Sequence, residues 1–269
     1  MLMQAKDWTW ALQPMLLLIA AQALWRYRRA LEPVVQRRWK HGAWIGVLLF
    51  IPAGVCLLHG DTRSAAWIGS EAAVLTAFFP IVLLGGYVCV RRSPGVWNSA
   101  RREDRALRSW LREKASRAGH RRYIDPLRGV LAGLVLLFVS LCYFAIVFYF
   151  YPDANITLET FLQIPLRALV YHVLLSAVWE ELLYRWLLMH WLLGLLRRVN
   201  YGRWIAIALS ALIWAVGHAT GYADPPWIKV AQVFLLGVLL GAAYPRLGLE
   251  GCIVAHFTMN LITMLAMGL

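Results

Sequence analysis

The chain has 269 residues, of which 61% are hydrophobic and 15% are charged. A soluble domain carries about a quarter charged residues, so this composition, with a mean hydropathy of +0.59, excludes an ordinary soluble domain and predicts a membrane protein. The net charge of +13 is concentrated in stretches between apolar runs. That distribution argues against nucleic acid and indicates anionic lipid headgroups as the partner.

Eight apolar segments are each long enough to cross a bilayer core of about 30 Å, which needs roughly 20 residues. We therefore predict an all-α, polytopic membrane helix bundle with about eight transmembrane helices. Residues 1–126 form an N-terminal part, and 127–269 form the core. The segments are 8–25, 43–59, 66–90, 127–151, 162–196, 203–220, 227–244 and 250–268. The fifth is too long for one straight span, and Pro165 and Gly194 are candidate breaks.

The orientation follows from the Lys and Arg residues of the loops, because basic loops stay in the cytoplasm. Loops 26–42, 91–126 and 197–203 are basic, and the second of them carries eleven Lys and Arg residues. The alternate loops, 60–65, 152–161 and 219–226, carry one basic residue between them. This alternation places both termini outside, and we expect the membrane to be a bacterial inner membrane.

The long loop 91–126 contains "ARREDRALRSWLREKASRAG", in which Leu107, Trp110, Leu111 and Ala115 recur at helical spacing. The pattern predicts a short amphipathic helix on the membrane surface, with its arginines at the headgroups. The alternative is a solvated basic linker.

The stretch "SAVWEELLYRWLLMHW", residues 176–191, places two glutamates deep in an apolar run. A charge near the bilayer centre costs at least about 2.5 kcal/mol, so such residues generally face the protein interior. Glu181 and Arg185 are four residues apart on one helix face, which predicts a buried ion pair that staples helices together. Glu180 has no basic residue three or four positions away, so it needs a partner on another helix or keeps its proton. This orphan carboxylate indicates function.

Two later helices carry further polar residues. "SALIWAVGHATG" places Ser210, Trp214 and His218 on roughly one helix face, and "EGCIVAHFTMNLI" does the same for His256 and Asn260. A lone membrane histidine is commonly a packing residue. Here, convergence on the orphan glutamate in one cavity is the more economical account.

Such a set can hydrolyse a peptide bond without a protein nucleophile. A glutamate and a histidine can remove a proton from a shared water. A second histidine and an asparagine can donate hydrogen bonds to the developing oxyanion. Glutamate and histidine are also zinc ligands, which leaves a metal site as a rival, although the chain has neither an HExxH motif nor a CxxC pair.

The same residues resemble a known family. "EELLYR" resembles the EExxxR motif of the CPBP intramembrane proteases, the group of CAAX-type proteases and bacteriocin-processing enzymes also called the Abi family. "WAVGH" is similar to its FxxxH motif, with Trp214 in place of Phe, and "HFTMN" matches its HxxxN motif. The region between them resembles the family's glycine-rich helix and its aromatic-x-Arg-x-Gly turn, so the likeness covers about 165–265.

The resemblance implies a metal-independent, glutamate-dependent endopeptidase within the membrane, without a cofactor, similar to the Ras-converting CAAX endopeptidase. Carried over, it implies that Glu180 and His218 activate water and that His256 and Asn260 form the oxyanion site. Glu181 and Arg185 are then supporting residues, and Trp214 supports the site by aromatic packing. The catalytic core is then 127–269, and the substrate is a membrane-embedded or membrane-associated protein or peptide. Bacteriocin-like peptides and proteins with C-terminal sorting tails are candidates.

Two other functions stay open at this stage. One is a non-catalytic immunity or partner-binding membrane protein on the same scaffold, since a fold does not prove turnover. The other is a proton-coupled transporter, in which glutamate and histidine relay protons. The predicted spans also raise a difficulty, because they place His218 and His256 roughly 10 Å apart in depth. A shared site requires tilt, a broken helix or a different boundary.

Overall fold

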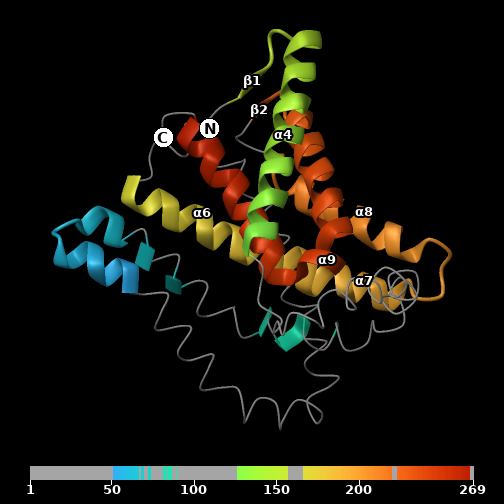
Figure 1. The fold of residues 1–269 in the computed structure, drawn as a ribbon, viewed down its shortest axis with the longest axis horizontal. Coiled ribbons are helices and arrows are strands. Elements are labelled where there is room, and N and C mark those ends of the chain that lie inside the picture. Colours follow the sequence, from blue (N-terminus) through green and yellow to red (C-terminus); the bar gives the residue numbers. More distant parts are fainter. Residues whose placement is uncertain are drawn as a thin grey trace, which may run out of the picture.

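The described part of the chain is mostly helical, as the sequence predicts (Figure 1). The predicted segment 8–25, the loop 26–42, the first part of 43–59, most of 66–90 and residues 91–125, with the predicted surface helix, lie outside the described residues. The computed structural model describes residues 51–66, 68–69, 72–73, 81–82, 84–86, 89, 126–156, 166–219 and 223–266.

Among the described residues, two helices are long and apolar enough to cross a membrane: α4, Pro126–Phe150, and α9, Trp227–Ala266. Proline suits the first position of α4, where no intrahelical hydrogen bond is lost. Leu131, Val135 and Phe138 of α4 are each more than half exposed, and apolar side chains of this kind suit a lipid-facing surface. A third apolar helix, α8, Gly202–Val216, is shorter.

Helix α9 consists of two limbs joined by a sharp turn. Gly248 has non-helical backbone angles with a φ of 72°, and Pro245 precedes it. A left-handed φ favours glycine, because a Cβ would strain this conformation. The two limbs correspond to the predicted segments 227–244 and 250–268, and the turn corresponds to the predicted aromatic-x-Arg-x-Gly sequence. In Figure 1 the limbs form a V, with α4 lying along them.

The long segment predicted at 162–196 contains three successive helical elements. α6, Leu166–Glu180, is followed directly by a π-helix, η1, Glu181–Met189, and then by α7, His190–Leu195. The predicted break at Pro165 lies outside the described residues, which resume at Leu166. The prediction of a break at Gly194 is wrong, since Gly194 lies inside α7. The helix changes its winding at the two glutamates instead.

The predicted all-α fold has one small exception. Residues Asn155–Ile156 form β1, which pairs antiparallel with β2, Ala223–Asp224. The sequence predicts loops at 152–161 and 219–226, and short parts of both pair as strands. Backbone pairing satisfies donors and acceptors that extended loops would otherwise leave to solvent. This two-stranded sheet joins the chain following α4 to the chain preceding α9.

The main core surrounds the π-helix. Its Leu182, Leu183, Leu187 and Leu188 are each at most 2% exposed, and they belong to one cluster with side chains of α8 and α9. A second cluster joins helical residues of 51–58 and 62–66 to α6 and to Met264 near the end of α9. The segment that carries the two glutamates is therefore held from several sides.

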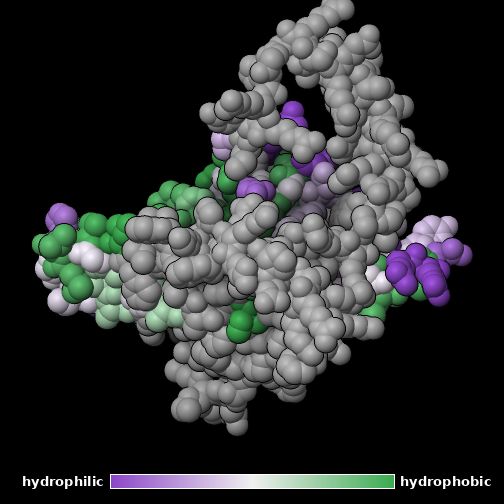
Figure 2. All heavy atoms as spheres, turned by 90° about the horizontal axis from the view of Figure 1, so that it is seen from below, coloured by the Kyte–Doolittle hydropathy of each residue, from purple (hydrophilic) through white to green (hydrophobic). Residues whose placement is uncertain are grey.

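The turn between α7 and α8 is the polar end of the described part. Residues 197–200 are exposed, and Figure 2 shows hydrophilic side chains gathered at this end of the molecule, which is on the right in both views. The opposite end, around the helical residues 51–58, is largely apolar (Figure 2). This contrast agrees with a basic loop at 197–203 between apolar spans.

The contact between α4 and α9 yields a stability prediction. A Cβ added at Gly133 would lie 2.6 Å from the Ala255 carbonyl oxygen and 2.8 Å from Thr258 Cβ. We expect Gly133→Ala to lower the free energy of unfolding by about 1–3 kcal/mol, because the helices must separate. Gly194→Ala is the control, since nothing lies within 4 Å of its added Cβ. Thermal unfolding in detergent would measure both, and equal stability of the two variants would contradict this packing.

Candidate active site

The two glutamates lie at the junction of two kinds of helix. Glu180 is the last residue of α6, and Glu181 is the first residue of the π-helix. A π-helix forms hydrogen bonds from residue i to residue i+5, and such turns are frequent at functional sites. The winding therefore changes at the point where the chain carries its deep carboxylates.

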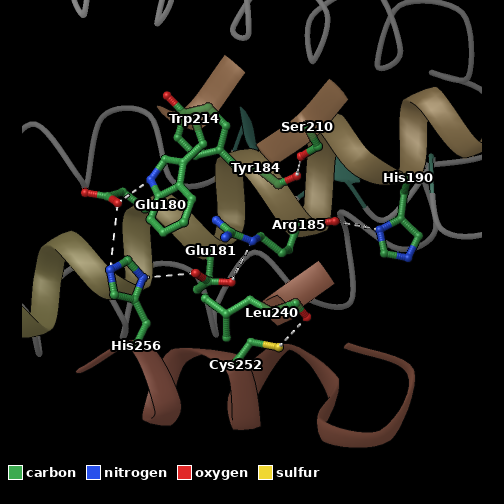
Figure 3. Close-up of polar contacts among 10 residues, drawn as sticks. All are labelled: Glu180, Glu181, Tyr184, Arg185, His190, Ser210, Trp214, Leu240, Cys252 and His256. Carbon is green, nitrogen blue, oxygen red and sulfur yellow. Dashed lines mark hydrogen bonds and ion pairs between the residues drawn. The ribbon is translucent and has the colours of Figure 1, made fainter. Parts of the chain in front are cut away.

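The predicted ion pair between Glu181 and Arg185 is present. Arg185 Nε lies 3.3 Å from Glu181 Oε2, and the two side chains are 2% and 0% exposed (Figure 3). Glu181 has a second partner that the sequence did not indicate, because His256 Nδ1 lies 3.0 Å from its Oε1. Glu181 thus joins its own helix to the second limb of α9.

Glu180 is oriented differently, and its side chain is 22% exposed. Its Oε2 accepts a 2.6 Å hydrogen bond from Trp214 Nε1 (Figure 3). The Nε2 atoms of His218 and His256 each lie 3.9 Å from this same oxygen. The two histidines of separate predicted helices therefore converge on Glu180, as expected from the sequence.

The expected difference in depth between the histidines is wrong. α8 ends at Val216, and its 15 residues rise only about 22 Å, so it is shorter than a full span. His218 therefore follows the end of a short helix and does not lie within a longer span at 203–220. The turn at Gly248 brings the second limb of α9, with His256, back toward the same level.

The tautomer of His218 follows from its backbone contact. Nδ1 lies 3.0 Å from the carbonyl oxygen of Trp214, an atom that can only accept, so Nδ1 is the donor. In the neutral ring Nε2 is then an acceptor, and it faces Glu180. An imidazole in this form can take a proton from a water molecule between them.

Side chains of the neighbouring elements bind carbonyl groups of the π-helix. Ser210 Oγ of α8 donates to the Tyr184 carbonyl at 2.6 Å, and His190 Nδ1 lies 2.7 Å from the Arg185 carbonyl (Figure 3). Both side chains are buried. The predicted polar face of α8 thus points at the π-helix. The sequence showed Ser210 on this face but gave no sign of its carbonyl partner.

The role of Trp214 could be predicted only in part from the sequence. It packs against the site, as expected, with its ring 5.5 Å from that of His218 and 5.3 Å from that of His256. The Arg185 guanidinium carbon lies 4.0 Å from the centre of the indole. The hydrogen bond to Glu180 adds a polar role that a phenylalanine could not have.

Asn260 lies one turn beyond His256 on α9 and is partly buried. The structure describes no hydrogen bond between Asn260 and the other predicted site residues. It shares the helix face of His256, as its i+4 spacing predicts. In the described ranges, no group of three or more His, Cys, Asp or Glu side chains is arranged to hold a metal ion.

The apolar helices indicate a membrane protein. The cluster of carboxylates, imidazoles and a guanidinium between them is a candidate hydrolytic centre. Residues 161–262 match the family model described as type II CAAX prenyl endopeptidase Rce1-like. All seven predicted site residues lie in this region. Through this region, the chain is similar to the CPBP family of membrane proteases.

A curated relative is the sporulation-killing factor biosynthesis protein SkfC of Bacillus subtilis (strain 168). It is 36% identical to this chain over 91 residues. The aligned region is 32% of this chain and only 17% of SkfC, so the chain spans a small part of that relative. No solved structure matches the chain.

Proposed function

We propose that the chain is an intramembrane endopeptidase in which Glu180 and His218 activate a water molecule. The observation that carries this proposal is the convergence of both histidines on Glu180 Oε2 at 3.9 Å. That separation exceeds a hydrogen bond, and it is one that a single water can bridge. The acceptor nitrogen of His218 faces the carboxylate, which suits removal of a proton from this water.

In the proposed reaction, the water oxygen attacks the carbonyl carbon of the scissile peptide, and its proton passes to the Glu180–His218 pair. The carbonyl π bond opens, and its oxygen becomes an oxyanion. When the tetrahedral intermediate collapses, the C–N bond breaks and the held proton goes to the leaving amine. The products are a carboxylic acid and an amine, which become a carboxylate and an ammonium group by proton exchange, and no metal ion or cofactor takes part in the proposed reaction.

We assign the oxyanion site to His256 and Asn260. His256 faces Glu180 through Nε2 and contacts Glu181 through Nδ1. In this proposal the ring carries protons on both nitrogens, so that Nδ1–H is held by Glu181 and Nε2–H is available to the oxyanion. Two carboxylates are then balanced by His256 and Arg185. Asn260, one turn further along α9, supplies a second donor.

The proposed setting is a bundle of about eight spans in a bacterial inner membrane, with both termini outside. The exposed Arg197 and Arg198 support a cytoplasmic position for the turn between α7 and α8, where they contact anionic headgroups. The proposed substrate is a membrane-associated peptide or protein. The name of SkfC, a protein of sporulation-killing factor biosynthesis, favours a precursor in the biosynthesis of such a factor.

The experiment that tests this function compares the termini of membrane proteins in cells that contain the wild-type chain or Glu180→Ala. We expect new termini at a small number of sites in membrane proteins or exported peptides, present only with the wild-type chain. Identical terminal peptides in both cell lines would contradict an endopeptidase. Expression levels of the two chains serve as the control.

Metal independence is tested on the purified protein. Because the proposed water is activated by side chains, we expect cleavage of an identified substrate to persist after treatment with 1,10-phenanthroline and EDTA. Loss of cleavage that added Zn²⁺ restores would instead favour the zinc site that the residue types also permit.

A further inference from the structure

The indole N–H of Trp214 is buried, and it donates a short hydrogen bond to a carboxylate. The side chain is 2% exposed, and Nε1 donates to Glu180 Oε2 at 2.6 Å. A buried indole N–H needs a partner, and a bond to a carboxylate is stronger than one between neutral groups. Within the described residues this is the one hydrogen bond that the Glu180 carboxylate makes.

Glu180 needs such an anchor, because its position alone leaves the carboxylate several orientations. It lies at the end of α6, is partly exposed, and has no basic side chain three or four residues away. The Trp214 bond fixes the oxygen that faces both histidines. A rotation of the carboxylate would change both 3.9 Å separations, and proton transfer depends on that geometry.

The same residue also orients the base. The Trp214 carbonyl accepts from His218 Nδ1, which makes His218 Nε2 the acceptor that faces Glu180. The Arg185 guanidinium lies over the face of the Trp214 indole. The indole also packs edge-to-face with the imidazole rings of both histidines. One residue thus contacts Glu180, Arg185 and both histidines.

We propose that Trp214 is a positioning residue that holds Glu180 through its indole N–H, beyond its role in aromatic packing. This inference rests on the proposed function for its effect on turnover. The hydrogen bond itself does not depend on that function. Trp214 therefore does not take part in proton transfer, and its donor sets the orientation of the residue that does.

The test replaces only the donor. Benzothienylalanine at position 214 keeps the bicyclic shape and has sulfur in place of N–H. With a peptide that the wild-type chain cleaves, we expect kcat to fall about tenfold to a hundredfold, with KM and Tm close to the wild-type values. Trp214→Phe should lose at least as much, and Trp204→Phe is the matched control, because Trp204 is 52% exposed.

Unchanged kcat in the benzothienylalanine variant would overturn the proposal and leave Trp214 as a packing residue. A parallel fall of Tm in that variant would also overturn it, since the donor would then serve stability.

A second readout needs no substrate. In NMR spectra of the ¹⁵N-labelled indole groups in detergent, the resonance that disappears in Trp214→Phe is assigned to Trp214. We expect this resonance to lie downfield in the wild-type chain and to move upfield in Glu180→Leu, because the carboxylate acceptor is lost. If the chemical shift of the Trp214 resonance is the same in Glu180→Leu as in the wild-type chain, the hydrogen bond itself is contradicted. If the NMR result holds while Glu180→Gln still cleaves peptides, the proposed function fails and the contact stands.

Discussion

We expect Glu180→Gln to lose peptide cleavage by about 10²–10⁴-fold while it unfolds at nearly the wild-type temperature. Glutamine has the size of glutamate, and its carbonyl oxygen can still accept the Trp214 N–H. It cannot take a proton from water, so the loss isolates the chemical role of the carboxylate. The measurement is kcat/KM for a peptide identified from the terminal-peptide comparison, with the purified chain in liposomes.

His218→Ala should lose activity to a similar extent, because both residues act on the same water in the proposed reaction. The two losses should be far from additive, as expected for groups that work as a unit. Glu250→Gln and His59→Ala are the controls, since both residues are exposed and neither contacts the site. Normal cleavage by both Glu180→Gln and His218→Ala would rule out this assignment.

The second large effect is on stability. We expect Arg185→Met to lower the free energy of unfolding by about 3–5 kcal/mol, because it removes one partner of a buried ion pair and leaves the Glu181 carboxylate fully buried. Methionine fills much of the space of the arginine side chain, which limits the contribution of a cavity. The contact of Glu181 with His256 remains and should retain part of the stability. Thermal or denaturant-induced unfolding in detergent measures the loss.

A double-mutant cycle separates the ion pair from packing. Adding Glu181→Gln to Arg185→Met removes the stranded charge, so the double variant should recover part of the lost stability. Arg198→Met is the control, because Arg198 is exposed in the turn between α7 and α8. If Arg185→Met unfolds at the wild-type temperature, the ion pair is not a staple.

Several features of the site could be predicted from residue spacing. The i,i+4 separation of Glu181 and Arg185 predicted their ion pair, and the structure confirms it at 3.3 Å. The periodicity of Ser210, Trp214 and His218 predicted a polar face, and these residues do point toward the π-helix and Glu180. Spacing was sufficient here because neighbours on one helix are fixed by its geometry. The catalytic roles of these residues stay predictions.

Contacts between helices could not be predicted in the same way. The pairing of His256 with Glu181 joins positions 75 residues apart, and it depends on the turn at Gly248. The error in the depth of His218 arose because hydropathy extended α8 beyond Val216, into a turn with apolar neighbours. The π-helix was not predicted either, since the side chains that bind its carbonyl groups, Ser210 and His190, lie on neighbouring elements.

By itself, the sequence determined the membrane class of the protein, its apolar core segments, the resemblance of residues 161–262 to a protease family and the set of polar residues within apolar segments. Composition and local periodicity are sufficient for these, because each reflects the burial preference of single helices. Only the tertiary structure decided which oxygen of Glu180 faces the histidines, and that the Trp214 N–H binds it. Those contacts depend on where α6 changes to the π-helix, where α8 ends and where α9 turns, and these points are set by packing between helices.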